Sequence, residues 1–515
     1  MLRQRALVLF AIGLAPACGR SAISVDQLQR DAHVPPDLTP AFGCAALQPL
    51  AAGVLTPRHA VRALFAPDRS SLVLQVRGEL TAYGNWVDDL LLVRLPSGEV
   101  SPIIGSINSF EWLQPGSTLL VNSGIDLVVV NTDGSGARTL VRNVCDHVAA
   151  PDGSRVYALH DCDSQSTGTM YAIDVASGAS TRLGVGASFG YPTPTRSTAV
   201  SPDGRWVAFV TFLPSLDPLA EGNIVVTVAN ADGRVETVTP QLYGNNPGFV
   251  SNDLLLYAAG SMIGAGDIRG HVPGTGDASY LIAANRYPSL FEYQVSPDKT
   301  WLLGAGESTG TSNQLYAIRL DGSGERLLAS DLYGFGDSPF ALRGFAFGST
   351  GRVLYNTGPH LGVATVGLAG GTPTVLSTDG WFVEAPRLDQ VALVEPFSDP
   401  LASPSRLRLV DLESGTDIFA YDSDGAIGTV GFPPNRRGLV FVESRFPALN
   451  RLRYSSADQS VVLGEWQATE FQPDWLADHN GTALDIYPVD PTGCFTVFDT
   501  DQTPGSGTRL AILPQ

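Results

Sequence analysis

The chain of 515 residues has a formal net charge of −19, and 16% of its residues are charged while 44% are hydrophobic. This acidic balance excludes nucleic-acid binding as a function, because phosphate recognition needs clustered lysine and arginine. The hydrophobic share suffices for a large core, and 55 glycines with 36 prolines are typical of many short strands joined by turns.

The start of the chain has the pattern of an export signal. Two arginines precede an apolar stretch at residues 6–14, which is too short to span a bilayer. Small residues then lead to Cys18, and this run resembles a bacterial lipobox with Cys18 as the lipidated residue. Cleavage without lipidation is the alternative. The segments we expect are a signal peptide (1–17), a tether (18–42) and one folded domain (43–515).

The five cysteines fit an oxidising compartment. With Cys18 lipidated, four remain, and Cys145 and Cys162 flank a turn that would bring them opposite each other on adjacent strands. We expect a disulfide between these two, and a second one that joins Cys44 to Cys494 and so ties the two ends of the domain. Four buried free thiols are the alternative.

A short phrase recurs along the chain. Residues 200–209 read VSPDGRWVAF and residues 295–303 read VSPDKTWLL, with looser copies at 66–69 and 150–153. In each copy a Pro-Asp-Gly type turn joins two apolar strands, since proline presets φ, aspartate bonds its own backbone and glycine accepts positive φ. A third strand, a second glycine turn and a fourth strand follow, as at residues 170–178.

Four antiparallel strands in about 40–45 residues are typical of one blade of a β-propeller, which buries its faces against neighbouring blades. We therefore predict an all-β propeller with about ten units. A single ring is favoured because no linker divides the chain, and two smaller rings remain open. The predicted first strands start near Val61, Ile107, Cys145, Ser197, Pro247, Phe291, Ala341, Phe382, Ile427 and Thr469.

These phrases resemble the repeats of TolB-type, WD40-like propellers, and they are similar to the propeller domain of prolyl oligopeptidases. The resemblance runs from about residue 60 onward and is best at 200–209 and 295–303. It implies a propeller fold, and TolB-type periplasmic proteins are implied to act by binding other envelope proteins. A propeller alone does not imply an activity, because the fold carries many. We expect no hydrolase domain.

The connections between predicted blades are rich in aromatic residues. In a propeller these connections lie on one face, together with the loops between second and third strands, and such loops are common binding sites. Aromatic side chains there would stack on sugars or anchor a protein. Sealing of the core between blades is the alternative role. The residues that we assign to this binding face are Tyr191, Tyr243, Tyr287, Tyr333 and Trp381.

The sequence contains few signals of a catalytic or metal-binding site. The histidines have no metal-binding spacing, although those at 147, 160, 271 and 360 fall in or beside predicted loops and would converge if the loops met at the axis. Acidic runs at 422–425 and 499–501 resemble fragments of calcium loops without the full spacing. We therefore assign no catalytic residue, no metal ligand and no cofactor, with calcium as the open option.

The sequence thus predicts an exported protein, held to a membrane only by a lipid, in the periplasm or at the outer membrane or cell surface. As its function we predict the binding of an envelope protein or glycan on one propeller face. The first alternative is a lyase or hydrolase acting on polysaccharide, with its site in the central funnel and carboxylates such as Glu307, Glu395, Asp217 and Asp399. A structural scaffold is a third. A histidine grouped with carboxylates at the axis would favour the enzyme.

Overall fold

In the computed structural model, the described residues are all-β apart from a 3₁₀ turn, η1 (Cys44–Leu47), and the helical residue Leu50. The described residues are 44–47, 50, 54–58, 60–66, 70–80, 86–113, 117–162, 167–188, 198–212, 224–238, 243–260, 266–276, 279–287, 294–306, 312–333, 345–348, 351–357, 362–382, 389–396, 405–433, 438–445, 449–466, 495–500 and 507–512.

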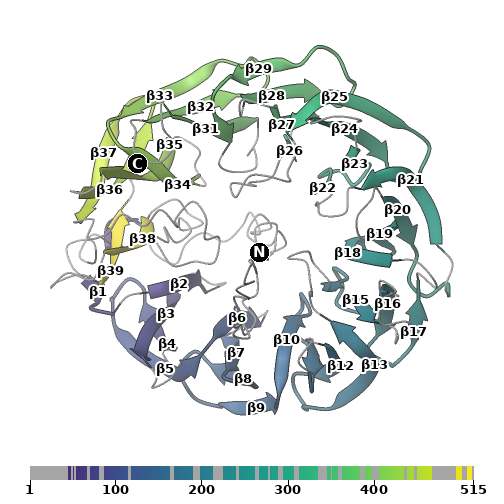
Figure 1. Cartoon of the computed structure of the whole chain (residues 1–515). Coiled ribbons are helices and arrows are strands. Elements are labelled where there is room, and N and C mark those ends of the chain that lie inside the picture. The colour runs from purple at the N-terminus through teal and green to yellow at the C-terminus, as the bar shows by residue number, and fades with distance from the viewer. Residues whose placement is uncertain are drawn as a thin grey trace, which may run out of the picture.

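Antiparallel sheets succeed one another around a common centre, as Figure 1 shows, so the chain forms a β-propeller in a single ring. Each set of four successive antiparallel strands is a blade, and the first strand of a blade lies nearest the centre. Blade 1 consists of β2 (Ala60–Phe65), β3 (Ser71–Leu80), β4 (Trp86–Arg94) and β5 (Val100–Ile107), and blade 2 of β6 (Ser109–Leu113), β7 (Thr118–Ser123), β8 (Asp126–Asn131) and β9 (Arg138–Val141). Blade 3 consists of β10 (Val144–Ala149), β11 (Arg155–His160), β12 (Thr167–Asp174) and β13 (Ser180–Ser188), and blade 4 of β14 (Thr198–Val200), β15 (Trp206–Phe212), β16 (Ile224–Asn230) and β17 (Val235–Thr237). Blade 5 consists of β18 (Tyr243–Ser251), β19 (Leu254–Gly260), β20 (Gly266–His271) and β21 (Ser279–Tyr287).

Blades 6 to 9 repeat the pattern of four strands. Blade 6 consists of β22 (Gln294–Val295), β23 (Trp301–Gly306), β24 (Ser312–Arg319) and β25 (Glu325–Tyr333), and blade 7 of β26 (Phe345–Phe347), β27 (Arg352–Thr357), β28 (Gly362–Gly367) and β29 (Thr374–Ser377). Blade 8 consists of β30 (Trp381–Phe382), β31 (Gln390–Pro396), β32 (Ser405–Asp411) and β33 (Asp417–Ser423), and blade 9 of β34 (Ala426–Gly431), β35 (Gly438–Arg445), β36 (Leu449–Ser456) and β37 (Ser460–Trp466). Five blades are separate four-stranded sheets, whereas blades 3 and 4, and blades 6 and 7, join into eight-stranded sheets.

The tenth unit is made from both ends of the chain. Its described strands are β38 (Phe495–Thr500) and β39 (Gly507–Ile512), and β39 also pairs with β1 (Val54–Thr56) from the start of the domain. The buried side chains of Leu47 and Leu510 belong to one core cluster with blade 1. The ring is therefore closed by backbone pairing and by shared apolar packing between the two ends.

The core lies between blades rather than within them. For example, Val73 and Leu90 of blade 1 pack in one cluster with Phe110 and Leu119 of blade 2. Neighbouring blades bury each other's faces in this way because a single four-stranded sheet has two apolar faces and nothing else to cover them. Residues at the interfaces between blades should therefore affect the stability of the fold more than the other residues of each repeat.

The repeated turns form as their composition predicts. The Ser201 hydroxyl lies 2.6 Å from Oδ1 of Asp203 and accepts a hydrogen bond from the Trp206 amide at 3.0 Å. Gly204 closes this turn with φ of +70°, where a glycine has no steric cost. In blade 6 the same place in the turn is taken by Lys299, with φ of +57°.

Candidate functional site

Four of the five aromatic positions assigned to the binding face lie at strand ends. Tyr243 and Trp381 are the first residues of β18 and β30, which are innermost strands. Tyr287 and Tyr333 are the last residues of β21 and β25, which are outermost strands. In an up-and-down blade the first strand begins on the face where the fourth strand ends, so all four backbone positions share one face. Tyr191 lies outside the described residues.

This placement divides the aromatic positions into two groups. Tyr243 and Trp381 lie on the inner rim of the ring, whereas Tyr287 and Tyr333 lie on its outer rim. The sequence alone does not separate these positions by their distance from the axis. The strand positions show that a small ligand near the centre would meet only the inner group, while a large partner could span both.

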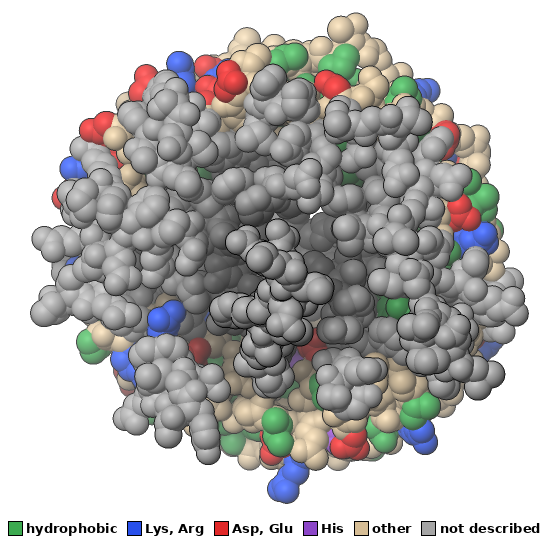
Figure 2. Space-filling view, in the orientation of Figure 1, with side chains coloured by type: hydrophobic (Ala, Val, Ile, Leu, Met, Phe, Trp, Pro, Cys, Tyr) green, Lys and Arg blue, Asp and Glu red, His purple; other side chains and the backbone are tan. Residues whose placement is uncertain are grey.

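A histidine and two carboxylates meet on the innermost strands of blades 2 and 3. Nε2 of His147 in β10 lies 3.5 Å from Oε1 of Glu111 in β6, and the two side chains are 10% and 22% exposed. Asp146 precedes His147 and accepts a hydrogen bond from the His147 amide at 2.8 Å. Figure 2 shows histidine and acidic side chains on the inner part of the ring, below its centre in this view. We call Glu111, Asp146 and His147 the inner acidic cluster.

The electrostatics of the inner acidic cluster are dominated by its burial. Burial raises the pKa of Asp146, and the nearby Glu111 raises it further, while His147 opposes this shift. Nδ1 of His147 is buried and has no hydrogen-bond partner among the described residues. A carboxyl with a raised pKa beside an imidazole is the kind of pair that general acid–base chemistry uses, and such groups gather at functional sites.

A cation lies on the innermost strand of the preceding blade. Arg62 in β2 donates a hydrogen bond from Nη1 to the Phe110 carbonyl at 2.8 Å, and its Cζ lies 5.2 Å from the centre of the Phe110 ring. Arg62 thus spans from blade 1 to blade 2 beside Glu111. Charged groups of both signs therefore lie on the innermost strands of three successive blades.

The other histidines are placed apart. His271 in β20 is fully buried and contacts Oε2 of Glu236 at 3.1 Å, between the outer strands of blades 4 and 5. His160 contacts Oδ2 of Asp161 at 2.7 Å at the end of β11. His360 lies outside the described residues. In the described part of the chain, no three His, Cys, Asp or Glu side chains are grouped so that they could hold a metal ion.

A second buried carboxylate has a structural explanation. Glu443 in β35 is fully buried, accepts a hydrogen bond from the Ser423 hydroxyl at 2.6 Å and lies 2.8 Å from Nε of Arg453. This network ties blade 8 to blade 9. Ser423 belongs to the acidic run at 422–425, so its hydroxyl is engaged in packing between blades. The acidic run at 499–501 has no described side chains.

Of the four carboxylates named for the enzyme that acts on polysaccharide, only Glu395 is described. It lies in blade 8, away from the inner acidic cluster in blades 2 and 3. Glu395 lies 2.6 Å from Nη1 of Arg408, which also contacts Asp417 at 2.6 Å. These residues belong to β31, β32 and β33 of blade 8. Glu307, Asp217 and Asp399 lie outside the described residues. Glu111 could not be identified from the sequence, because a single glutamate in a short strand has no local signal.

The cysteines are described in part. Cys145 and Cys162 form a disulfide across the β10–β11 hairpin, with their Cα atoms 6.2 Å apart. Cys44 is the first residue of η1, but its side chain, like Cys18 and Cys494, lies outside the described residues. The pairing of Cys44 with Cys494 therefore stays a prediction. Among the described residues, no helix is long and apolar enough to cross a bilayer.

Two segments of the chain match Gly-x-Ser-x-Gly, the pattern of a hydrolase nucleophile elbow, at 186–190 and 306–310. Such an elbow needs a sharp turn from a strand into a helix. Ser188 is instead the last residue of β13, where it pairs with Val210 of β15. The second segment begins at Gly306, the end of β23, and the next described element is the strand β24.

Comparisons with known proteins give weak likeness only. No protein-family model matches the chain, and no curated protein matches it. Among solved structures, the chain is similar to Porphyromonas gingivalis dipeptidyl peptidase 4 with a TM-score of 0.47 and 13% identity, over 77% of this chain and 66% of that one, which is slightly less than two thirds. A puromycin-hydrolyzing peptidase of Mycobacterium tuberculosis gives 0.33 and 15%, over 77% and 63%. TolB from Acinetobacter baumannii gives 0.27 and 12%, over 60% and 81%.

Proposed function

We propose that the protein is an exported, lipid-anchored binding protein of the cell envelope, which recognises a protein or a glycan on one face of the propeller. The observation that supports this best is the position of Tyr243, Tyr287, Tyr333 and Trp381 at strand ends on a single face. Aromatic residues on a rigid scaffold provide large contact areas at little entropic cost, which makes them frequent anchors of interfaces.

Binding to envelope fractions tests this proposal. The full chain is mixed with purified peptidoglycan sacculi and, separately, with detergent-solubilised envelope proteins, and bound protein is measured by sedimentation and by crosslinking. We expect Trp381→Ala and Tyr243→Ala to weaken binding at least tenfold to one of the two. Lys299→Ala, in a turn on the opposite face, is the control and should leave binding unchanged. Equal binding by all variants would overturn the role of this face.

The location is tested separately from the binding. The pattern before Cys18 supports export and lipidation. Mass spectrometry of the mature N-terminus should find Cys18 as the first residue, carrying acyl chains. An unmodified first residue, or an intact N-terminus beginning at Met1, rejects the anchor without affecting the binding face.

The inner acidic cluster favours a second candidate function. Glu111 and His147 lie 3.5 Å apart on innermost strands, with Asp146 beside them, as an enzyme acting on polysaccharide in the central funnel would need. In this role one group removes or donates a proton while another holds the substrate. Lyase activity on uronic-acid polymers, followed by the ultraviolet absorbance of the unsaturated product, should fall at least 100-fold in His147→Ala. No activity in the wild type removes this candidate.

A further inference from the structure

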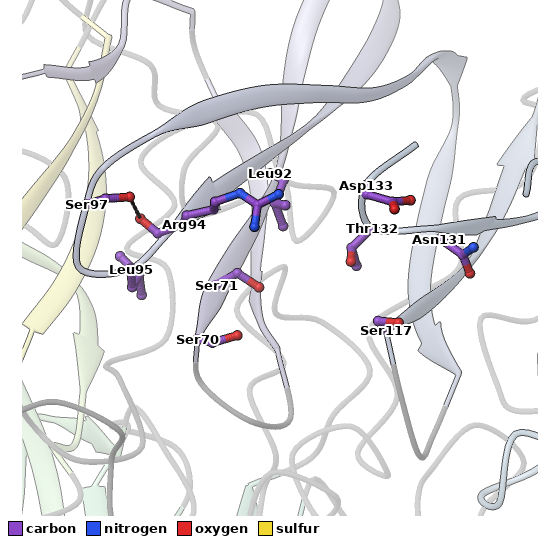
Figure 3. Close-up of a pocket in the computed structure, with 10 residues that line it drawn as sticks. All are labelled: Ser70, Ser71, Leu92, Arg94, Leu95, Ser97, Ser117, Asn131, Thr132 and Asp133. Atoms are coloured by element: carbon purple, nitrogen blue, oxygen red, sulfur yellow. Dashed lines mark hydrogen bonds between the residues drawn. The ribbon is translucent and has the colours of Figure 1, made fainter. Parts of the chain in front are cut away.

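A pocket of about 570 Å³ lies between blades 1 and 2, on the face opposite the aromatic positions (Figure 3). It opens at the edge where β3 begins and β4 ends, beside the β8–β9 turn of the next blade. Hydroxyl, amide and charged groups dominate its walls. Those that matter here are Ser71, Arg94, Ser117, Asn131, Thr132 and Asp133.

The pocket exists because blade 1 departs from the repeat at Ser71. The carbonyl of Ser71 accepts a backbone hydrogen bond from Ala66, and the equivalent bond in blade 4 runs from Ser201 to Trp206 and in blade 6 from Ser296 to Trp301. Trp206 and Trp301 each pack between their own blade and the next one. A serine thus stands where two other blades place an indole ring, which leaves space empty.

Blade 2 departs from the repeat on the other wall. The Thr132 amide donates to the Ser117 carbonyl, and the same bond is made by Leu320 in blade 6, Leu368 in blade 7 and Leu412 in blade 8. Leu320 and Leu412 are buried against the preceding blade, and Leu368 packs there too. One small side chain alone would leave a shallow gap between the blades. Ser71 and Thr132 face the same interface, so together they make a polar pocket.

The charges of the pocket balance. Arg94 and Asp133 come from opposite walls, as Figure 3 shows. The only ion pair of Arg94 found among the described residues is a loose one, 3.7 Å from its Nε to Glu99, with both side chains more than half exposed. Hydrogen bonds from Ser135 hold the pKa of Asp133 below its usual range, so that it stays ionised at neutral pH. A net charge on a ligand would be attracted by one wall and repelled by the other.

We propose that this pocket binds a neutral saccharide unit. Hydroxyls donate and accept hydrogen bonds, as sugar hydroxyls do, and an arginine facing an aspartate offers paired donors and paired acceptors to neighbouring hydroxyls of one ring. The volume falls in the usual range for small-ligand sites. This site is separate from the proposed aromatic face, so either can fail without the other.

The test uses variants that copy the chain's own repeats. Ser71→Trp installs the residue of blades 4 and 6, and Thr132→Leu installs that of blades 6 to 8. Saturation-transfer NMR and calorimetry on the full chain would use chitotriose, maltotriose, cellotriose and mannotriose at about 1–10 mM, a range that covers weak binding. We expect at least one of these to bind the wild type, and both variants to weaken that binding tenfold or more.

Controls separate the pocket from general effects. Arg155→Trp makes the same exchange at the equivalent position of blade 3, away from the pocket, and should bind like the wild type. The two filling variants should melt at or above the wild-type temperature, which shows that they fold. Asp133→Asn, which keeps the shape, should weaken binding severalfold. Absence of binding by all four sugars, equal binding by the filled variants, or preference for trigalacturonate or a Gly-Ser peptide overturns the proposal.

Discussion

Nε2 of His147 lies 3.5 Å from Oε1 of Glu111, and the two residues come from innermost strands of neighbouring blades. The contact joins two repeats, and the two side chains are 10% and 22% exposed. Its neighbour Asp146 is held in a place that disfavours its charge. Asp146 should therefore make the stability of the ring depend on pH, in the direction opposite to turn aspartates such as Asp298, whose pKa is lowered by hydrogen bonds from Ser296 and Thr300.

Replacing Asp146 tests this dependence. Because burial raises its pKa above the unfolded value of 3.8, the folded chain holds this proton more tightly than the unfolded chain. The contribution of Asp146 is therefore most favourable at low pH and is lost as the pH rises through the folded pKa. In urea unfolding at several pH values between about 4 and 8, wild type should lose stability relative to Asp146→Asn as the pH rises. A constant difference, or one of opposite slope, contradicts this.

Removal of the disulfide should lower stability. The bond joins Cys145 and Cys162, which are 17 residues apart, and a loop of this size is worth about 3 kcal/mol. The Cys145→Ala/Cys162→Ala variant should unfold at lower urea than the wild type, and dithiothreitol should lower the wild-type midpoint. A further effect of dithiothreitol on the double variant would reveal the bond predicted between Cys44 and Cys494. A thiol count on unfolded, unreduced protein should be near zero if both pairs form.

Lys299 offers a stabilising substitution. Its φ of +57° is in the left-handed region, and the equivalent residue in blade 4, Gly204, has φ of +70°. Relief of this strain outweighs the added freedom of the unfolded chain, so Lys299→Gly should gain about 0.5–1 kcal/mol. Gly204→Lys is the reverse exchange and should lose stability, since its Cβ would lie 3.0 Å from that of Ala150. A loss in Lys299→Gly would show that the lysine side chain stabilises the turn.

Ring closure is tested at Leu510. This side chain is 2% exposed and packs with Leu47 and the core of blade 1. Leu510→Ala should cost about 3 kcal/mol through lost burial and a cavity. Limited proteolysis with mass spectrometry should then find faster cleavage near Leu47 and near β1, because Leu47 packs in one cluster with Leu510 and β1 pairs with β39. Val461→Ala, at a residue 36% exposed in β37, is the control and should change stability by less than about 0.5 kcal/mol.

The blades could be predicted because each one carries its own local signals. Turns such as the one at Gly204, together with period-2 alternation, mark a blade without reference to the rest of the chain. The predicted starts at Val61, Cys145 and Ile427 fall in the first strands of blades 1, 3 and 9. The start predicted near Thr469 lies outside the described residues. In the structure, the tenth unit is instead defined by β38, β39 and β1.

The contacts between blades could not be predicted in the same way. The pairing of Val54 with Arg509 joins opposite ends of the sequence, and three residues of β1 have too little pattern to indicate a partner. Glu111 and His147 meet only because two bulged or short inner strands align. The pocket at Ser71 is defined by comparison with the residues that other blades place at the equivalent position, and backbone hydrogen bonds identify that position. Such features depend on register across sheets, which no local window contains.

The strand with which β1 pairs, β39, follows all nine blades along the chain. A nascent chain can complete blades 1 to 9 one after another from local contacts, but residues 54–56 must wait for β39. Until then the apolar face of blade 1 that packs with Leu510 is uncovered, and such a face can bind another chain. Loss of β39 would therefore leave a nearly complete arc with an uncovered apolar face, so this one strand bears on solubility as well as on ring closure.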